Sequence, residues 1–141
     1  MKKLLNYSAY LVFTLSLIFF IFSVFAYFFF VVPLQSYELD ASASISEGSI
    51  GVDVNDSALT FGIIAPGGTS LRKVFIANNY KFPVRIRAIS DGEIEHLLDY
   101  PITTRVEPGQ QATIPVTLVV PDNSSYGNYS GKVKFLVIRD K

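Results

Sequence analysis

The residues best suited to chemistry lie in one short segment of the C-terminal half. His96 is the only histidine of the chain, and Glu93, Glu95 and Asp99 are its neighbours in the sequence. A histidine among carboxylates can bind a metal ion or transfer protons. Metal sites need several ligands that converge at defined spacing, however, and this segment offers only carboxylates beside His96. We therefore assign these residues no catalytic and no metal-binding role, and we interpret the segment as a solvated loop.

The other carboxylates do not form a second catalytic pattern. Glycosidases use two carboxylates that flank one cleft, whereas the acidic residues here fall mostly at expected strand ends and loops. They are Asp53, Asp56, Asp91, Glu93, Glu95, Asp99, Glu107 and Asp122. The chain has no Gly-x-Ser-x-Gly motif and no dinucleotide fingerprint, and no Lys follows Gly67-Gly68-Thr69 in the register of a phosphate loop. We expect no enzymatic activity, no catalytic residue and no cofactor.

Three Asn-x-Ser sequons would accept glycans if this part of the chain is exported. Their asparagines are Asn55, Asn123 and Asn128, and all three lie in or beside expected loops. Roughly one such triplet arises by chance in a domain of this size. Glycosylation at these asparagines is therefore a hypothesis, and whether any of them is used stays open.

Two further features concern surfaces. Arg85 and Arg87 share one face of an expected strand by parity, and Lys73 joins them if its own strand packs alongside in register. Charged outward positions are ordinary on an antiparallel sheet, so a ligand-binding face is the less favoured interpretation. The last expected strand is apolar on both faces from Phe135 to Ile138. It is either buried between sheets or an edge that recruits another chain by strand addition.

An apolar segment at the N-terminus indicates on which side of a membrane these residues lie. The run Ala9–Pro33 carries no charge and exceeds the roughly 20 apolar residues that a bilayer core requires. Lys2 and Lys3 precede it and the first charges after it are acidic, so the positive-inside rule puts the N-terminus in the cytoplasm. We predict a cytoplasmic segment at 1–7, a transmembrane signal-anchor helix at 8–33 that contacts the lipid bilayer, and a C-terminal domain outside the cell membrane.

A cleavable secretory signal is the alternative interpretation of this segment. Lys2 and Lys3 suit the start of a signal peptide, and Val24-Phe25-Ala26 has the small-residue pattern that a signal peptidase accepts. Apolar residues nevertheless continue through Val32, whereas the apolar core of a signal peptide usually has about 7 to 15 residues. We favour the retained anchor, and cleavage near Ala26 stays open.

The composition limits what the exported part can be. Once an anchor and a spacer are removed, about 95 residues remain, which is enough for one small domain. The whole chain has 12 Lys and Arg against 12 Asp and Glu, and no cysteine. The absence of cysteine excludes a disulfide framework and a thiolate metal site. The sequence also shows no basic patch of the kind that binds nucleic acid.

The pattern after the apolar run is typical of an all-β fold. Residues 34–48 are polar without a sustained apolar period, so we predict a spacer there. Residues 49–141 contain short runs rich in Val, Ile, Thr and Phe, separated by turn residues. The expected strands are 49–54, 59–64, 71–77, 83–89, 103–106, 112–118 and 132–139, with a short strand or a helical turn in 91–100. We predict an antiparallel sandwich of seven or eight strands, and Pro115 argues for an edge position of its strand.

Several of these segments resemble known domains. Leu59–Gly62, Pro66–Thr69 and Asn78-Asn79 are similar to the opening of immunoglobulin-like domains of the Hydin type. Val106–Gln110 and Tyr126–Gly131 look like the second half of bacterial and archaeal surface Ig-like modules. The resemblance implies an Ig-like β-sandwich without the Cys…Trp…Cys core of antibody domains. It implies little about activity, because the motifs are turns and strand starts.

Three hypotheses on function follow. The first is a single-pass surface protein that displays an Ig-like domain for protein contact or envelope structure, through a protein partner or self-association at a sheet edge. The second is a secreted filament subunit, released by cleavage near Ala26, in which residues 35–48 or an edge strand complete a neighbour's sheet. The third is a carbohydrate-binding accessory module or tethered enzyme, and it requires a site that the sequence does not reveal.

Overall fold

The computed structural model describes residues 2–30, 32–47 and 58–140. It divides into two compact units, Met1–Val32 and Pro33–Lys141. We call the second of these the β unit. The expected strand at 49–54 and the sequon asparagine Asn55 lie outside the described residues.

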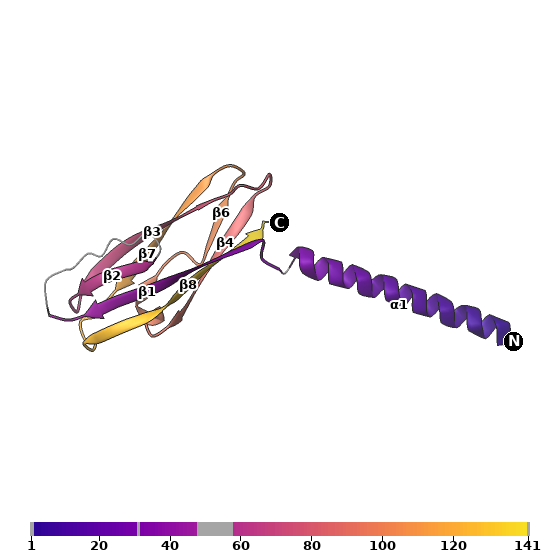
Figure 1. The fold of residues 1–141 in the computed structure, drawn as a ribbon, viewed down its shortest axis with the longest axis horizontal. Coiled ribbons are helices and arrows are strands. Elements are labelled where there is room, and N and C mark those ends of the chain that lie inside the picture. Colours follow the sequence, from indigo (N-terminus) through magenta and orange to yellow (C-terminus); the bar gives the residue numbers. More distant parts are fainter. Residues whose placement is uncertain (1, 31, 48–57, 141) are drawn as a thin grey trace. The chain divides into compact units, whose positions relative to one another are not determined.

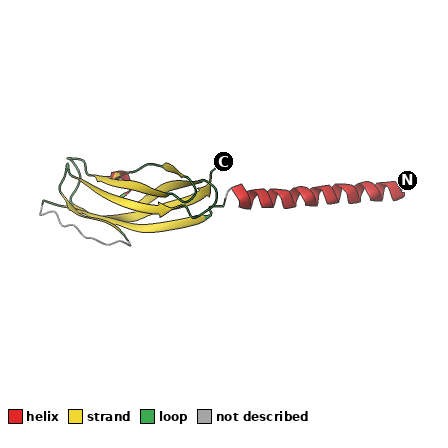
Figure 2. Ribbon diagram, turned by 90° about the horizontal axis from the view of Figure 1, so that it is seen from above, coloured by secondary structure: helices red, strands yellow, loops and turns green. Residues whose placement is uncertain are grey.

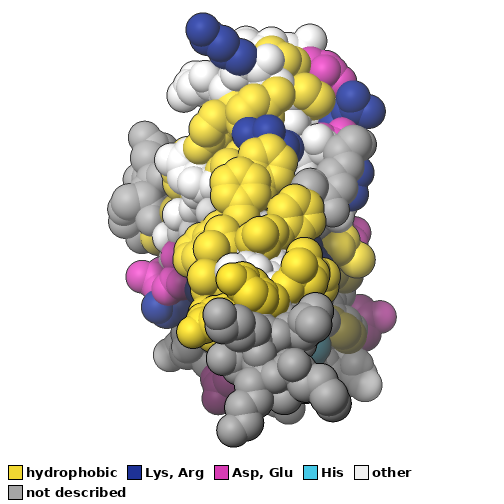
Figure 3. Space-filling view, turned by 90° about the vertical axis from the view of Figure 1, so that its right-hand side faces the viewer, with side chains coloured by type: hydrophobic (Ala, Val, Ile, Leu, Met, Phe, Trp, Pro, Cys, Tyr) yellow, Lys and Arg dark blue, Asp and Glu magenta, His cyan; other side chains and the backbone are white. Residues whose placement is uncertain are grey.

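The first unit is one apolar helix, α1, at Lys2–Phe30. It contains neither Gly nor Pro, and it ends shortly before Pro33, a residue that does not continue a helix. The stretch Tyr10–Phe29 is long and apolar enough to cross a membrane by length and composition, and none of it is buried. Most of the large hydrophobic side chains that are exposed belong to α1, and hydrophobic side chains cover the middle of the face drawn in Figure 3. The prediction of an apolar N-terminal helix is confirmed.

The β unit consists of strands and one short 3-10 helix (Figures 1 and 2). In chain order the elements are β1 Gln35–Ile45, β2 Leu59–Ile64, β3 Thr69–Ala77, β4 Val84–Gly92, η1 Glu95–Leu97, β5 Leu98–Asp99, β6 Thr103–Val106, β7 Gln111–Val119 and β8 Gly127–Arg139. The described residues thus hold eight strands. The irregular segment supplies both a helical turn and a short strand. The turns expected at Pro66-Gly67 and Pro108-Gly109 are confirmed.

The strands form two sheets. A five-stranded sheet has the order β2-β1-β8-β4-β6, and a three-stranded sheet has the order β3-β7-β5. All pairs are antiparallel except β1 with β2, which is parallel. The fold is mainly β, but the larger sheet is mixed, so the prediction of purely antiparallel sheets is wrong. The parallel pair requires a long return connection, and residues 46–58 have that length.

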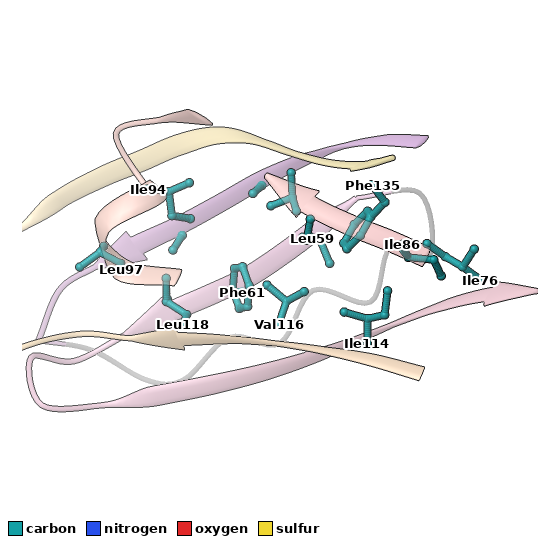
Figure 4. Packing of buried hydrophobic residues seen from close by; sticks show 14 of the residues in the cluster. Leu59, Phe61, Ile76, Ile86, Ile94, Leu97, Ile114, Val116, Leu118 and Phe135 are labelled. Carbon is teal, nitrogen blue, oxygen red and sulfur yellow. The ribbon is translucent and has the colours of Figure 1, made fainter. Parts of the chain in front are cut away.

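One hydrophobic core lies between the two sheets (Figure 4). The predicted alternation in β4 is confirmed, since Val84 and Ile86 are buried while Arg85 and Arg87 are exposed. The alternation in β7 is confirmed as well. Phe135 of β8 is fully buried, and such a side chain stabilises the folded state by about 2 kcal/mol through its removal from water.

The spacer predicted at 34–48 is wrong for residues 35–45, which form β1. This strand pairs with β8 along its whole length and with β2 at its end. Its inward residues include Ala41, Ala43 and Ile45, all buried, and they alternate with serines and Asp40. Alanine and serine differ little in size and hydropathy, so this period-2 pattern is faint in the sequence. The segment proposed as a donor for a neighbour's sheet completes the chain's own sheet.

Two other expectations about strand position are also corrected. β8 lies between β1 and β4, so its two apolar faces reflect burial within a central strand and not a recruiting edge. β7 lies between β3 and β5, so Pro115 is not on an edge strand. β5, however, pairs with β7 only opposite Thr117 and Leu118. Beside Pro115, no described strand pairs with β7 on the side of β5. A proline, which has no N–H to donate to a neighbouring strand, is therefore tolerated at this position.

A buried amide joins the two sheets at one end of the β unit. Asn78 is 2% exposed, and its side-chain nitrogen donates to the carbonyls of Phe82 and Val106, each at 3.0 Å. Its side-chain oxygen accepts from the backbone N–H of Tyr80 at 3.0 Å. Every polar atom of this side chain therefore has a partner, as a buried amide requires.

Candidate functional site

The segment around His96 does not assemble a catalytic or metal site. Within residues 2–30, 32–47 and 58–140, no three His, Asp or Glu side chains come together as a metal ligand set. His96 is exposed on η1, and its ring meets the edge of the Tyr129 ring at a centroid distance of 6.0 Å. Asp99 lies apart on the three-stranded sheet. The fold anchors this segment through Ile94 and Leu97, which are buried.

A shallow hollow of about 450 Å³ lies beside His96. It is lined by Glu93, His96, Tyr126, Gly127, Asn128 and Tyr129. The hydroxyl of Tyr126 donates to Glu47 at 2.6 Å, and this hydrogen bond to a carboxylate raises the pKa of Tyr126. The lining thus combines two tyrosine rings, the His96 imidazole and the Glu93 carboxylate. Among the described residues, no buried side-chain polar atom lacks a hydrogen-bond partner.

The two sequons that the structure describes are accessible. Asn123 lies in the exposed turn between β7 and β8, and Asn128 is an exposed residue at the start of β8, opposite Ser44. Asn123 therefore belongs to the connection before β8, and Asn128 is among the first residues of β8 itself. Their exposure satisfies the steric requirement for glycan attachment.

The outer surface of the five-stranded sheet is strongly charged, and we call it the charged face. Its charged outward residues are Glu38, Asp40, Arg85, Arg87, Asp91, Arg105, Lys132 and Lys134. Glu38 binds Lys132 at 2.6 Å and Lys134 at 3.1 Å. The hydrogen bond from Lys132 lowers the pKa of Glu38, and the same contact raises the pKa of Lys132. These charges stand on adjacent strands and neutralise one another across the sheet.

A second ion-pair network lies at the edge of the charged face. The Asp140 side chain is 2% exposed and accepts from Arg85 and, at 2.9 Å, from Arg105. Arg105 also contacts Glu107 at 3.1 Å. Arg85 and Arg105 are direct cross-strand partners, so the carboxylate between them offsets the repulsion of two like charges. This gives Arg85 a structural partner.

Lys73 does not join Arg85 and Arg87. It lies on β3, which pairs with β7 in the other sheet, whereas the two arginines lie on β4. The condition under which Lys73 would join the two arginines is therefore not met, because parity within a strand does not specify which strands become neighbours.

The outer surface of the three-stranded sheet differs from the charged face, and we call it the apolar face. Its outward residues are Thr69, Leu71, Lys73, Phe75 and Ala77 on β3, Gln111, Thr113, Pro115, Thr117 and Val119 on β7, and Asp99 on β5. Leu71 is 51% exposed, Phe75 60% and Val119 43%. β7 contains no charged residue. The sequence carries a signal for this face, because β3 has apolar residues at both parities, but the expectations above did not use it.

A groove of about 830 Å³ runs beside the apolar face, where the edges of the two sheets meet. Residues of β1, β2 and β3 line it, among them Leu39, Leu59 and Val74. Arg72 closes the gap between the sheets, since its Nε and Nη2 donate to the carbonyl oxygen of Thr60 at 2.8 and 2.6 Å. This contact ties β3 to β2 and fixes the position of the apolar face over the core.

Comparisons of the chain with protein-family models, curated proteins and solved structures give no match.

Proposed function

We propose that this chain is a single-pass membrane protein that holds an Ig-like β-sandwich outside the cell, where the domain acts by protein contact. Lys2 and Lys3 at the start of α1, before its apolar run, and the acidic residues after the helix favour a cytoplasmic N-terminus. The exposed Asn123 and Asn128 are the described positions at which an exported domain would carry glycan.

The observation that carries this proposal is the full exposure of an apolar helix immediately before a folded unit. No part of Tyr10–Phe29 is buried, and an exposed apolar surface of this length is unfavourable in water. β1 begins at Gln35, and the N–H of Leu34 already donates to the carbonyl of Val137 at 2.8 Å. The chain between helix and sheet is therefore short, and cleavage near Ala26 would leave the exposed Tyr27 and Phe28 ahead of the β unit.

The Ig-like assignment is supported by the strand arrangement as well as by the turn motifs. β8 pairs with β1 and β4, and β3 pairs with β7, so most neighbouring strands are distant in the sequence. Such connections are typical of Greek-key sandwiches. The parallel β1–β2 pair is a departure from a purely antiparallel arrangement.

Intact-mass spectrometry of the protein extracted from membranes tests the anchor. We expect the mass of the uncleaved chain, plus sugar if the sequons are used, and we expect alkaline carbonate to leave the protein in the membrane. The matched control is Ala26→Leu, which removes the small residue that a signal peptidase needs and preserves the apolar run. If the wild-type protein loses its N-terminal segment and the Ala26→Leu protein keeps it, the anchor proposal fails.

A further inference from the structure

The charged face and the apolar face differ in how many of their charges are paired. On the charged face, Glu38, Lys132, Lys134, Arg85 and Arg105 take part in ion pairs, whereas within the described residues Asp40, Arg87 and Asp91 do not. The apolar face carries two charges, Lys73 and Asp99, and within the described residues neither has an ion-pair partner. We propose that the apolar face binds a second copy of this chain, face to face about a two-fold axis. The proposal rests on the proposed function, since it names the partner that the displayed domain contacts.

The apolar side chains supply the attraction for this contact. Leu71, Phe75 and Val119 are large and substantially exposed on one sheet surface, and threonines and Pro115 separate them. Large exposed apolar side chains with few charges among them are typical of the centre of a protein interface. A two-fold interface uses the same patch on both subunits, so the patch must be complementary to itself.

The two unpaired charges meet that requirement. Lys73 lies on β3 and Asp99 on β5, the two outer strands of the three-stranded sheet, with β7 between them. A two-fold axis that lays β3 across the β5 strand of the second copy brings Lys73 towards the partner's Asp99, and it forms this pair twice. Lys73 stands opposite Pro115 and Asp99 opposite Thr117, a stagger of about 7 Å along the strand. The long lysine side chain and the crossing angle of packed sheets accommodate it.

Charge also favours face-to-face packing over pairing of two β3 edges. In an antiparallel β3–β3 pair that sets Leu71 opposite Phe75, Lys73 stands opposite Lys73 of the second copy. Like charges directly opposite each other destabilise a strand pair. This edge-to-edge register is therefore less favourable than face-to-face packing, in which Lys73 meets Asp99.

Disulfide cross-linking of the full-length chain in lipid nanodiscs or detergent tests the geometry, because the chain has no cysteine of its own. Thr117→Cys lies on the apolar face near the proposed axis, and Thr103→Cys on the charged face is the matched control. Mild oxidation should give disulfide-linked dimers at least about tenfold more efficiently with Thr117→Cys. Equal yields from the two variants would overturn the proposal.

Charge reversal tests the identity of the partner. We expect Lys73→Glu and Asp99→Lys each to reduce cross-linking through Thr117→Cys by about tenfold, because each places like charges together. The double variant should restore it to near the starting level, since the pair forms again with reversed sign. Arg87→Glu on the charged face is the control and should change nothing. Circular dichroism verifies that each variant remains folded.

Failure of the double variant to restore a folded, cross-linked dimer would refute the Lys73–Asp99 contact and with it the proposal. A protein that stays in carbonate-washed membranes as a monomer would overturn this inference and leave the proposed function standing. A protein released by carbonate would end the proposed function, whatever its oligomeric state.

Discussion

The outer surfaces of the two sheets cover the same core but differ in how they meet their surroundings. On the charged face, five of the eight charged outward side chains form ion pairs within the chain, as Glu38 does with Lys132. On the apolar face, Phe75 and Leu71 stay exposed, and the charges of Lys73 and Asp99 have no ion-pair partner within the described residues. Surface ion pairs add little stability, so the charged face mainly keeps one side of the unit soluble. The exposed side chains of the apolar face are available to contact another molecule.

Two phenylalanines give the largest expected difference. Phe135→Ala, in the core beneath the charged face, should lower the free energy of unfolding by about 3–5 kcal/mol, because it leaves a cavity. Phe75→Ala, on the apolar face, should change the unfolding free energy of the isolated chain by less than about 0.5 kcal/mol. Urea unfolding of the full-length chain in detergent, followed by circular dichroism, measures both. Similar losses in the two variants would mean that Phe75 belongs to the core and that the apolar face is not a free surface.

Asn78 is expected to have the next largest effect, because it links the sheet of the apolar face to the sheet of the charged face. Asn78→Ala leaves the buried carbonyl of Val106 without its side-chain donor, at a cost of about 1–3 kcal/mol. The neighbouring Asn79 is exposed, and Asn79→Ala is the control with little effect. Thermal unfolding compares the two variants. An unchanged transition in Asn78→Ala would show that water replaces the amide and that the two sheets are not coupled through it.

Substitution of one aspartate at each face compares the stability contributions of the two faces directly. Asp140→Asn removes the charge that Arg85 and Arg105 share. It should cost about 1–2 kcal/mol, less than a fully buried pair, because both arginines can be hydrated. Asp99→Asn, on the apolar face, should leave stability unchanged and weaken only the dimer. Urea unfolding at a concentration where the chain is monomeric separates these effects, and equal destabilisation by the two substitutions would remove the distinction between the faces.

The pH dependence of the Glu38 pair is the smallest expected effect. The hydrogen bond from Lys132 depresses the pKa of folded Glu38 below its ordinary value of 4.5, so the pair stabilises the fold above that value and the contribution disappears as pH falls through the folded pKa. Wild type should therefore be slightly more stable than Glu38→Gln at neutral pH, and the gap should close in acid and in high salt. Unfolding midpoints across this pH range measure the gap. A gap that widens in acid would contradict the ion pair.

Local sequence patterns predicted much of the fold correctly. β2 and β6 have the expected bounds, and the Pro-Gly turns lie where expected because proline and glycine restrict the backbone locally. β1 was missed because its alternation of alanine and serine gives little hydropathy contrast. The start of β8 was missed for a related reason. Residues 127–131 are polar or small, and they become a strand by pairing with β1.

The candidate interface was not predictable in the same way. The sequence predicts that Lys73 and Arg85 point outward. That they lie on different sheets is decided only by strand pairing, of β3 with β7 and of β4 with β8. It marked Asp99 as part of a loop, and the two-residue strand β5 places it on the apolar face. Neither pairing has a local signal, because each depends on hydrogen bonds and packing between segments far apart in the chain.

The sequence by itself determined the apolar helix, the mainly β character of the remainder and the positions of its turns. These properties depend on side-chain hydropathy and backbone restriction within a few residues. The tertiary structure alone decided that β8 is central, that β1 completes the larger sheet in parallel with β2, and that one outer face is charged while the other is apolar. The reason is that a face is assembled from neighbouring strands, and which strands become neighbours is determined by the packing of the whole core.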